Sequence, residues 1–88
     1  MRISKEKRDK ISEQILSYLH HNFPKPYFTA EIAREIARDE EFIKELMLDL
    51  KNKRLVVSIK KNPQGVFYSR RIRWRLSGQA QQAYRELP

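Results

Sequence analysis

Apolar residues recur every three or four positions along three stretches of the first 53 residues. This spacing places them on one face of an α-helix. In the first stretch Ile11, Ile15 and Leu19 share such a face, and Ser4 is a suitable N-cap. Two prolines follow it, and proline ends a helix because it has no backbone N–H to donate. The spacing predicts helices over about 5–21, 30–37 and 40–52.

The second and third predicted helices follow one another with almost no linker. Thr29 and Asp39 stand where N-caps belong, because their side-chain oxygens can accept hydrogen bonds from the amides of a first helical turn. Only two or three residues separate the two helices, so we expect them to cross at a large angle.

Beyond the third helix the hydrophobic period changes from helical to alternating. The β-branched run LVVSI predicts a strand over about 54–60, and VFYSRRIRWRL predicts another over about 66–76. Turn-forming residues in KKNPQG join the two strands into a hairpin. Ile72, Trp74 and Leu76 alternate with arginines, so we expect one face, with Trp74, in the core and the other face to carry arginine.

A last helix is predicted over about 78–86, with Ser77 at its start. The order is then helix, short helix, tight turn, helix, β-hairpin and helix, within a single domain of residues 1–88. This α+β order resembles that of a winged helix-turn-helix domain, a three-helix bundle with a β-hairpin wing and a C-terminal helix.

Local sequence patterns carry the same resemblance over about residues 8–87. The closing segment RWRLSGQAQQAY looks like the segment that leads from the wing into the last helix of MarR-type and ArsR-type regulators. The segment TAEIAREIARDEEFIKELMLDLKNKRLVV is similar to the family's helix-turn-helix and first wing strand. Its matching positions are Thr29, Glu31-Ile32-Ala33, Ile43, Met47, Leu50 and Leu55-Val56. The resemblance implies a DNA-binding domain.

Two positions depart from the family pattern. Ala37-Arg38 stands in the turn where the family usually has glycine, and Arg54 stands where glycine usually precedes the first wing strand. With no glycine there, we expect a residue near Asn52 to end the third helix, with Asn52 itself in a left-handed conformation.

Charge is distributed unevenly along the chain. The formal net charge is +8, made up of +3 over residues 1–28, −2 over residues 29–53 and +7 over residues 54–88. An acidic middle between basic flanks is typical of a protein that binds a polyanion, usually nucleic acid.

The predicted hairpin carries most of the excess positive charge, with no acid between Ser58 and Ser77. Lysines alone would protect an edge strand from aggregation, so the arginine-rich run favours nucleic-acid contact in a minor groove or along phosphates. The candidate contacts of the wing are Lys60, Lys61, Asn62, Gln64, Arg70, Arg71 and Arg73.

The third helix would be the recognition helix of the family, which lies in the DNA major groove. Glu40, Glu41 and Glu45 on its exposed face are repelled by phosphates, which disfavours tight sequence-specific reading and leaves a simple solvated face as the alternative. Leu48 would suit a protein partner as well as a thymine methyl. The candidate contacts of the helix-turn-helix are Thr29, Lys44, Lys51 and Asn52.

The basic N-terminus offers further candidate contacts, Lys5, Lys7 and Arg8, as a phosphate-binding arm or simply a solvated end. We expect no metal and no cofactor, because the chain has no cysteine and its two histidines are adjacent on a helix, pointing about 100° apart. No nucleophile–histidine–acid set and no glycine-rich phosphate loop occur, so we expect no enzyme activity.

Duplex DNA is the expected partner, for a small transcriptional regulator or a chromosome-associated protein that is cytoplasmic and nucleoid-associated. Two alternatives remain: a winged helix used as a protein-interaction module, and a hairpin that lies on an RNA backbone. No membrane segment is expected. A homodimer through the terminal helices is also expected, in which Ala80, Ala83, Tyr84 and Leu87 would meet the stripe of Ile11, Ile15 and Leu19.

Overall fold

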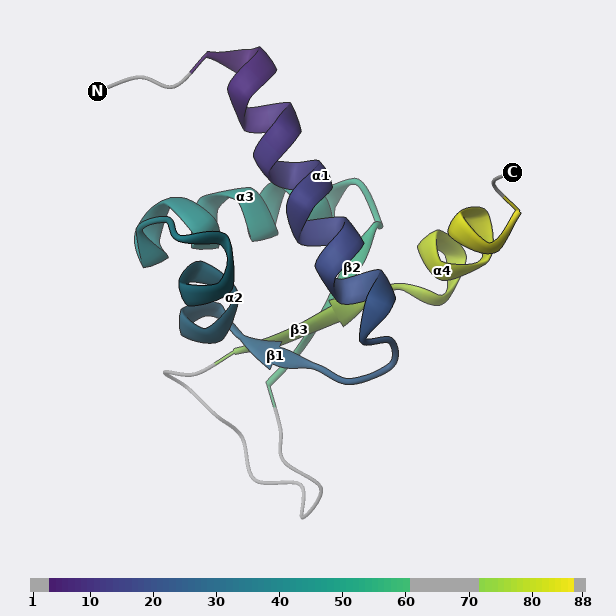
Figure 1. Cartoon of the computed structure of the whole chain (residues 1–88). Coiled ribbons are helices and arrows are strands. Elements are labelled where there is room, and N and C mark those ends of the chain that lie inside the picture. Colours follow the sequence, from purple (N-terminus) through teal and green to yellow (C-terminus); the bar gives the residue numbers. More distant parts are fainter. Residues whose placement is uncertain (1–3, 61–71, 87–88) are drawn as a thin grey trace.

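The computed structural model describes residues 4–60 and 72–86, which form helices and a three-stranded sheet (Figure 1). The predicted winged-helix order of elements is confirmed. The elements are α1 (Lys5–His21), β1 (Tyr27–Phe28), α2 (Thr29–Ile36), α3 (Glu40–Asn52), β2 (Val56–Ile59), β3 (Arg73–Leu76) and α4 (Gly78–Arg85).

Side-chain caps start three of the helices, as the sequence predicts. The Ser4 hydroxyl accepts from the amide of Lys7 at 3.3 Å, and a carboxylate oxygen of Asp39 accepts from the amide of Phe42 at 3.2 Å. The Ser77 hydroxyl accepts from the amide of Ala80 at 3.0 Å. Each cap satisfies an amide that the helix itself leaves without a partner.

Helix α2 begins differently from the prediction. Its N-cap is Phe28, whose backbone amide donates to Glu31 Oε1 at 2.8 Å, and Thr29 is already helical. The prediction that Thr29 caps this helix was wrong because the Thr29 hydroxyl accepts a hydrogen bond from the indole N–H of Trp74, at 2.8 Å. A partner 45 residues away in the chain cannot be read from local spacing.

Helices α2 and α3 end in the same way, each with a residue in the left-handed conformation and the hydrogen bonds of a Schellman motif. At α2 the left-handed residue is Ala37, with φ 61°, and the amide of Arg38 donates to the carbonyl of Ala33 at 3.0 Å. At α3 it is Arg54, with φ 63°. Asn52 is the last helical residue, so the expectation of a left-handed Asn52 was wrong.

The sheet is antiparallel, in the order β1-β3-β2. Strand β1 pairs Tyr27 with Trp74, a pairing that the sequence pattern did not predict because two residues are too few to show alternation. Strand β2 is shorter than the predicted 54–60, and β3 starts at Arg73. The rest of the predicted second strand, residues 66–71, lies outside the described residues.

The core lies between the inner face of the sheet and helices α1, α2 and α3. Trp74 and Leu76 have no exposed surface, which confirms the predicted burial of this strand face. The sequence predicts that Ile11, Ile15 and Leu19 of α1 offer an apolar stripe to a second subunit. They are at most 2% exposed, so the stripe packs inside the domain instead. Burial of these side chains supplies most of the driving force for folding.

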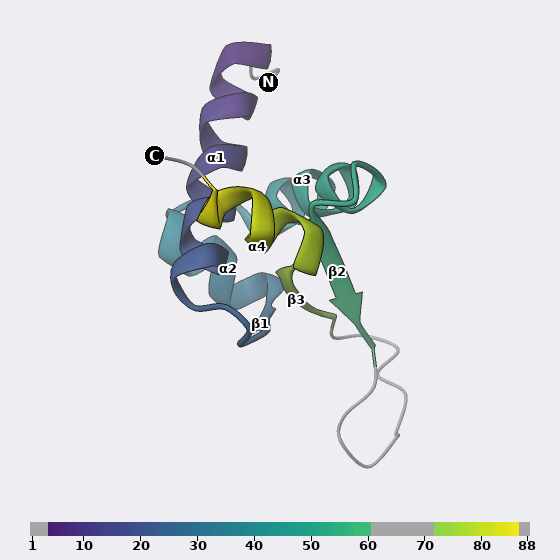
Figure 2. The ribbon, with the colours of Figure 1, turned by 90° about the vertical axis from the view of Figure 1, so that its right-hand side faces the viewer.

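Helices α1 and α4 meet near the C-terminal end of α1. The His20 ring stacks on Tyr84 with centroids 4.7 Å apart, and His20 Nδ1 lies 2.7 Å from Gln81 Oε1. Seen from the side, α1 lies on one side of the molecule while α3 and β2 lie on the other (Figure 2). This arrangement decides which basic residues share a surface.

Candidate nucleic-acid interface

The outward face of α3 is exposed along its whole length. Leu48 is 43% exposed and stands out among the large hydrophobic residues of the described chain. The predicted exposed positions of α3 are all exposed: Glu40, Glu41, Lys44, Glu45, Leu48, Lys51 and Asn52. A helix that presents one free face next to a hairpin has the geometry needed to enter a groove.

Charge is polarised along α3. Glu40 and Glu41 occupy the first turn, where carboxylates are stabilised by the positive end of the helix dipole, and Lys51 occupies the last turn. Lys53, just beyond the helix, forms an ion pair with Asp49 at 3.2 Å. Both partners are about half exposed, so this pair contributes at most about 1 kcal/mol. Phosphate would therefore be repelled at the start of α3 and attracted at its end.

The outer face of the sheet combines arginine with apolar side chains. Cross-strand pairing sets Arg73 beside both Phe28 and Ile59, and Arg75 beside Val57. The Arg73 guanidinium carbon lies 6.0 Å from the centre of the Phe28 ring, and Arg75 donates to the carbonyl of Leu76 at 3.1 Å. Both arginines are half-buried, so the arginine face that the sequence predicts is packed at the base of the hairpin.

Only part of the predicted wing site is described. Lys60 is exposed directly after β2, and Arg73 pairs with Ile59, so these two residues lie at the same end of the hairpin. The remaining wing candidates lie outside the described residues: Lys61, Asn62, Gln64, Arg70 and Arg71.

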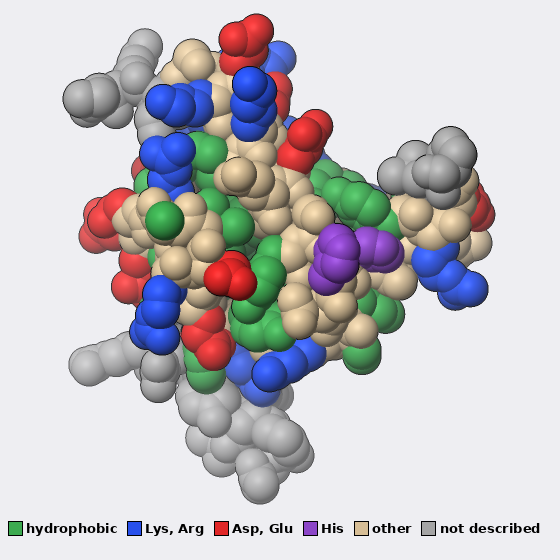
Figure 3. All heavy atoms as spheres, viewed as in Figure 1, with side chains coloured by type: hydrophobic (Ala, Val, Ile, Leu, Met, Phe, Trp, Pro, Cys, Tyr) green, Lys and Arg blue, Asp and Glu red, His purple; other side chains and the backbone are tan. Residues whose placement is uncertain are grey.

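The structure does not bring the basic N-terminus together with this surface. Lys5, Lys7 and Arg8 lie in the first turns of α1, on the opposite side from α3 and β2 (Figure 2). Basic and acidic side chains alternate over this end of α1 (Figure 3). The predicted contacts of Lys5, Lys7 and Arg8 with DNA therefore stay a prediction, separate from the surface of α3 and β2.

Sequence reasoning left Arg54, an exposed cation next to α3, out of the candidate contacts. Arg54 is exposed and follows Lys51 and Lys53 at the junction of α3 and β2. The available signal was its position, because an arginine stands there where the winged-helix pattern usually has glycine. Thr29, in contrast, is half-buried and its hydroxyl is engaged by Trp74.

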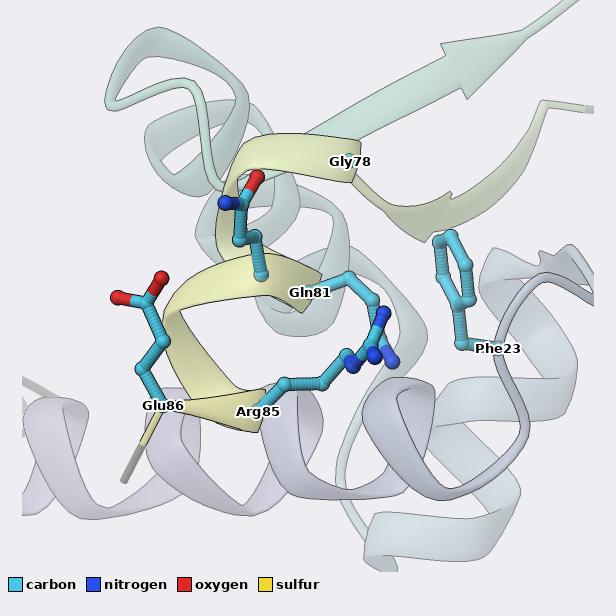
Figure 4. A pocket seen from close by; sticks show the side chains of 6 residues that line it. Phe23, Gly78, Gln81, Arg85 and Glu86 are labelled. Atoms are coloured by element: carbon cyan, nitrogen blue, oxygen red, sulfur yellow. The ribbon is translucent and has the colours of Figure 1, made fainter.

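A shallow pocket of about 450 Å³ lies beside α4, away from α3 and β2. Gln81 and Arg85 point toward Phe23 across it, whereas Glu86 points away (Figure 4). Among residues 4–60 and 72–86, no cluster of histidine, aspartate or glutamate side chains could hold a metal ion. The helices of the same residues include none long and apolar enough to cross a membrane.

One strongly shifted ionisable group lies on the α1 side of the molecule. Burial raises the pKa of Tyr18 to about 12, helped by a hydrogen bond to Tyr27 and by the nearby carboxylates of Glu35 and Glu31. The two tyrosine rings lie 5.0 Å apart. The pair of Tyr18 and Tyr27 thus joins α1 to β1.

Comparison with known proteins gives a clear result at the level of fold. No protein-family model matches the chain, and no curated protein is significantly similar to it. A mutant of ZitR from Lactococcus lactis in its apo form is similar in structure, with a TM-score of 0.70 and 20% sequence identity over 92% of this chain. A MepR mutant from a clinical isolate of S. aureus is similar at a TM-score of 0.68, with 18% identity over 90% of this chain.

A third similar structure is an S. aureus MepR mutant bound to an oligodeoxyribonucleotide, with a TM-score of 0.61 and 21% identity over 93% of this chain. ZitR is described as a zinc-responsive MarR family member. The chain spans little more than half the length of the ZitR and MepR chains that it matches first, 56% in both cases. At this level of identity the likeness shows the fold, and the chain has the winged-helix fold seen in these MarR-family structures.

Proposed function

We propose that this domain binds double-stranded DNA through α3 and the β2–β3 hairpin, as a small transcriptional regulator or a chromosome-associated protein of the cytoplasm. The observation that carries the proposal is the exposed face of α3 beside the β2–β3 hairpin. Residues 54–88, which include the hairpin and α4, carry a net charge of +7. A similar structure, a MepR mutant, is bound to an oligodeoxyribonucleotide, which supports DNA as the polyanion.

The acids on α3 shape how this binding would work. Glu40, Glu41 and Glu45 repel phosphates, so most of the affinity should come from basic residues outside the first half of the helix. Phosphate contacts position a protein without reading sequence. We therefore infer binding that is strong at low salt and has modest sequence preference.

The test is a titration of a DNA duplex at several salt concentrations. If about five charges meet phosphates, log affinity should fall against log salt with a slope of about −4 to −5. Single-stranded DNA and duplex RNA, titrated in the same buffers, separate duplex recognition from general polyanion binding. A dependence that is flat between low and moderate salt would remove the DNA proposal.

A protein-interaction module is the second candidate function, and one observation favours it. Leu48 is 43% exposed midway along the outward face of α3, where a hydrophobic anchor would suit a protein partner. If the module binds a protein there, Leu48→Ala, which adds no charge to α3, would weaken that complex and leave the salt slope of duplex binding unchanged. Loss of duplex binding in the same variant would instead place Leu48 in the DNA groove.

A further inference from the structure

Among residues 4–60 and 72–86, two exposed residues that are not glycine hold the left-handed conformation, Ala37 at φ 61° and Arg54 at φ 63°. Such a residue is strained relative to glycine, because its Cβ crowds the following carbonyl. Ala37 shows that this fold tolerates the strain without any long side chain. The strain alone therefore does not mark a site, and the surroundings of Arg54 have to be considered.

The backbone at Arg54 is held from both sides. Its amide donates to the carbonyl of Lys51 at 2.9 Å, and its carbonyl accepts from the hydroxyl of Ser77 at 2.9 Å. The next residue, Leu55, donates to Leu50 at 3.0 Å and accepts from Ser77 at 3.0 Å. Arg54 is thus fixed at the point where α3, β2 and the start of α4 meet, and only its side chain has freedom to lose on binding.

The charge around Arg54 is not neutralised within the described part of the chain. Lys53 is paired with Asp49, but no ion pair joins Arg54 or Lys51 to an acid among residues 4–60 and 72–86. The negative end of the helix dipole opposes an anion here. The carbonyls of Leu50 and Lys51, however, already accept hydrogen bonds from backbone amides. The full positive charges of Lys51 and Arg54 also exceed the half negative charge at this end of the helix dipole.

We propose that a DNA phosphate binds at the α3–β2 junction, between the side chains of Lys51 and Arg54. The inference rests on the proposed DNA binding and adds which end of α3 the DNA backbone contacts, namely the C-terminal end. Helix-turn-helix proteins commonly use the N-terminal residues of this helix for contact with bases. Here that end carries Glu40 and Glu41, and the acids would keep phosphates away from it.

The residues on either side of β2 are far enough apart to contact the DNA backbone at two separate phosphates. Arg54 and Lys60 are six residues apart, so they lie at most about 20 Å from each other at about 3.3 Å per residue. The major and minor grooves of B-DNA are roughly 12 and 6 Å wide. Lys51 with Arg54 at one end and Lys60 at the other can thus reach phosphates on different sides of a groove.

The experiment compares Arg54→Gly with Ala37→Gly, a matched control that removes the same backbone strain without removing a charge. Both variants should unfold at higher denaturant concentration than the unchanged protein. Only Arg54→Gly should bind duplex DNA more weakly, by about eightfold at 0.1 M salt, and its salt slope should shrink by about one unit, as expected for one lost phosphate contact. Arg54→Lys should keep most of the affinity and the slope.

The outcomes are distinguishable. Equal duplex affinity and equal salt slope for Arg54→Gly and Ala37→Gly would overturn the junction contact while leaving the proposed DNA binding intact. If the unchanged protein fails to bind duplex DNA at low salt, both proposals fall. Loss of binding on one DNA sequence only would also contradict the inference, because a phosphate contact weakens binding to every sequence about equally.

Discussion

The indole N–H of Trp74 donates a 2.8 Å hydrogen bond to the hydroxyl of Thr29, joining the central strand β3 to the first residue of α2. Trp74 has no exposed surface, so its N–H has no access to bulk water as a substitute partner. The bond therefore ties the start of α2 to the central strand of the sheet.

Thr29→Val removes this acceptor while keeping the shape of the side chain. We expect the free energy of unfolding to fall by about 1–3 kcal/mol, because a buried donor is left without a partner. Urea denaturation measures the change. Thr29→Ser keeps the hydroxyl and should cost clearly less; equal losses for the two variants would mean that the methyl group, and not the hydrogen bond, matters.

The wing and α3 can be separated by two sets of substitutions. Arg70, Arg71 and Arg73 changed together to alanine should remove most of the duplex affinity, whereas Lys44→Ala with Asn52→Ala should remove much less. The reason is that Glu40, Glu41 and Glu45 already make the first part of α3 a poor electrostatic partner.

Duplex titration of both variants at one fixed salt concentration measures the difference. Circular dichroism must first show that each variant is folded, since Arg73 contacts Phe28. A helix variant that loses more affinity than the wing variant would show that the protein reads the major groove in the usual way of helix-turn-helix proteins.

Tyr18 gives stability a specific dependence on pH. Its pKa is raised from 10.0 to about 12 in the folded protein, so folding favours the protonated phenol. The associated stabilisation is complete below pH 10 and should be lost as the pH rises from about 10 to about 12. Thermal unfolding across this range should show a steeper decline for the unchanged protein than for Tyr18→Phe, which cannot ionise. Parallel declines would assign the alkaline loss to other groups.

A homodimer through the terminal helices stays a prediction. Fewer apolar residues are exposed for it than the sequence suggested. The apolar residues of α1 are in the core, and Ala80 of α4 is buried with them. In α4, Ala83 is exposed and Tyr84 is half-buried against His20, while Leu87 lies outside the described residues. Light scattering at increasing protein concentration should show a dimer mass; a monomer mass at all concentrations would remove the hypothesis.

Short-range signals in the sequence were enough to place the long helices. The bounds of α1 and α3 follow from the hydrophobic period and from the caps Ser4 and Asp39, because a cap binds an amide only two or three residues away. The alternation around Trp74 was enough to predict its burial, since a strand places successive side chains on opposite faces. These features depend on neighbours in the chain, so the sequence alone determines them.

Other features depend on residues far apart in the chain, and only the tertiary structure decided them. The pairing of β1 with β3 and the bond from Trp74 to Thr29 each join segments about 45 residues apart, so neither leaves a local pattern. The backbone of Arg54 is held in the left-handed conformation by hydrogen bonds to Lys51 and to Ser77, and Ser77 lies 23 residues away in the chain. The separation of the basic end of α1 from α3 and β2 is likewise set by how the helices pack, since charge counts along a sequence carry no direction in space.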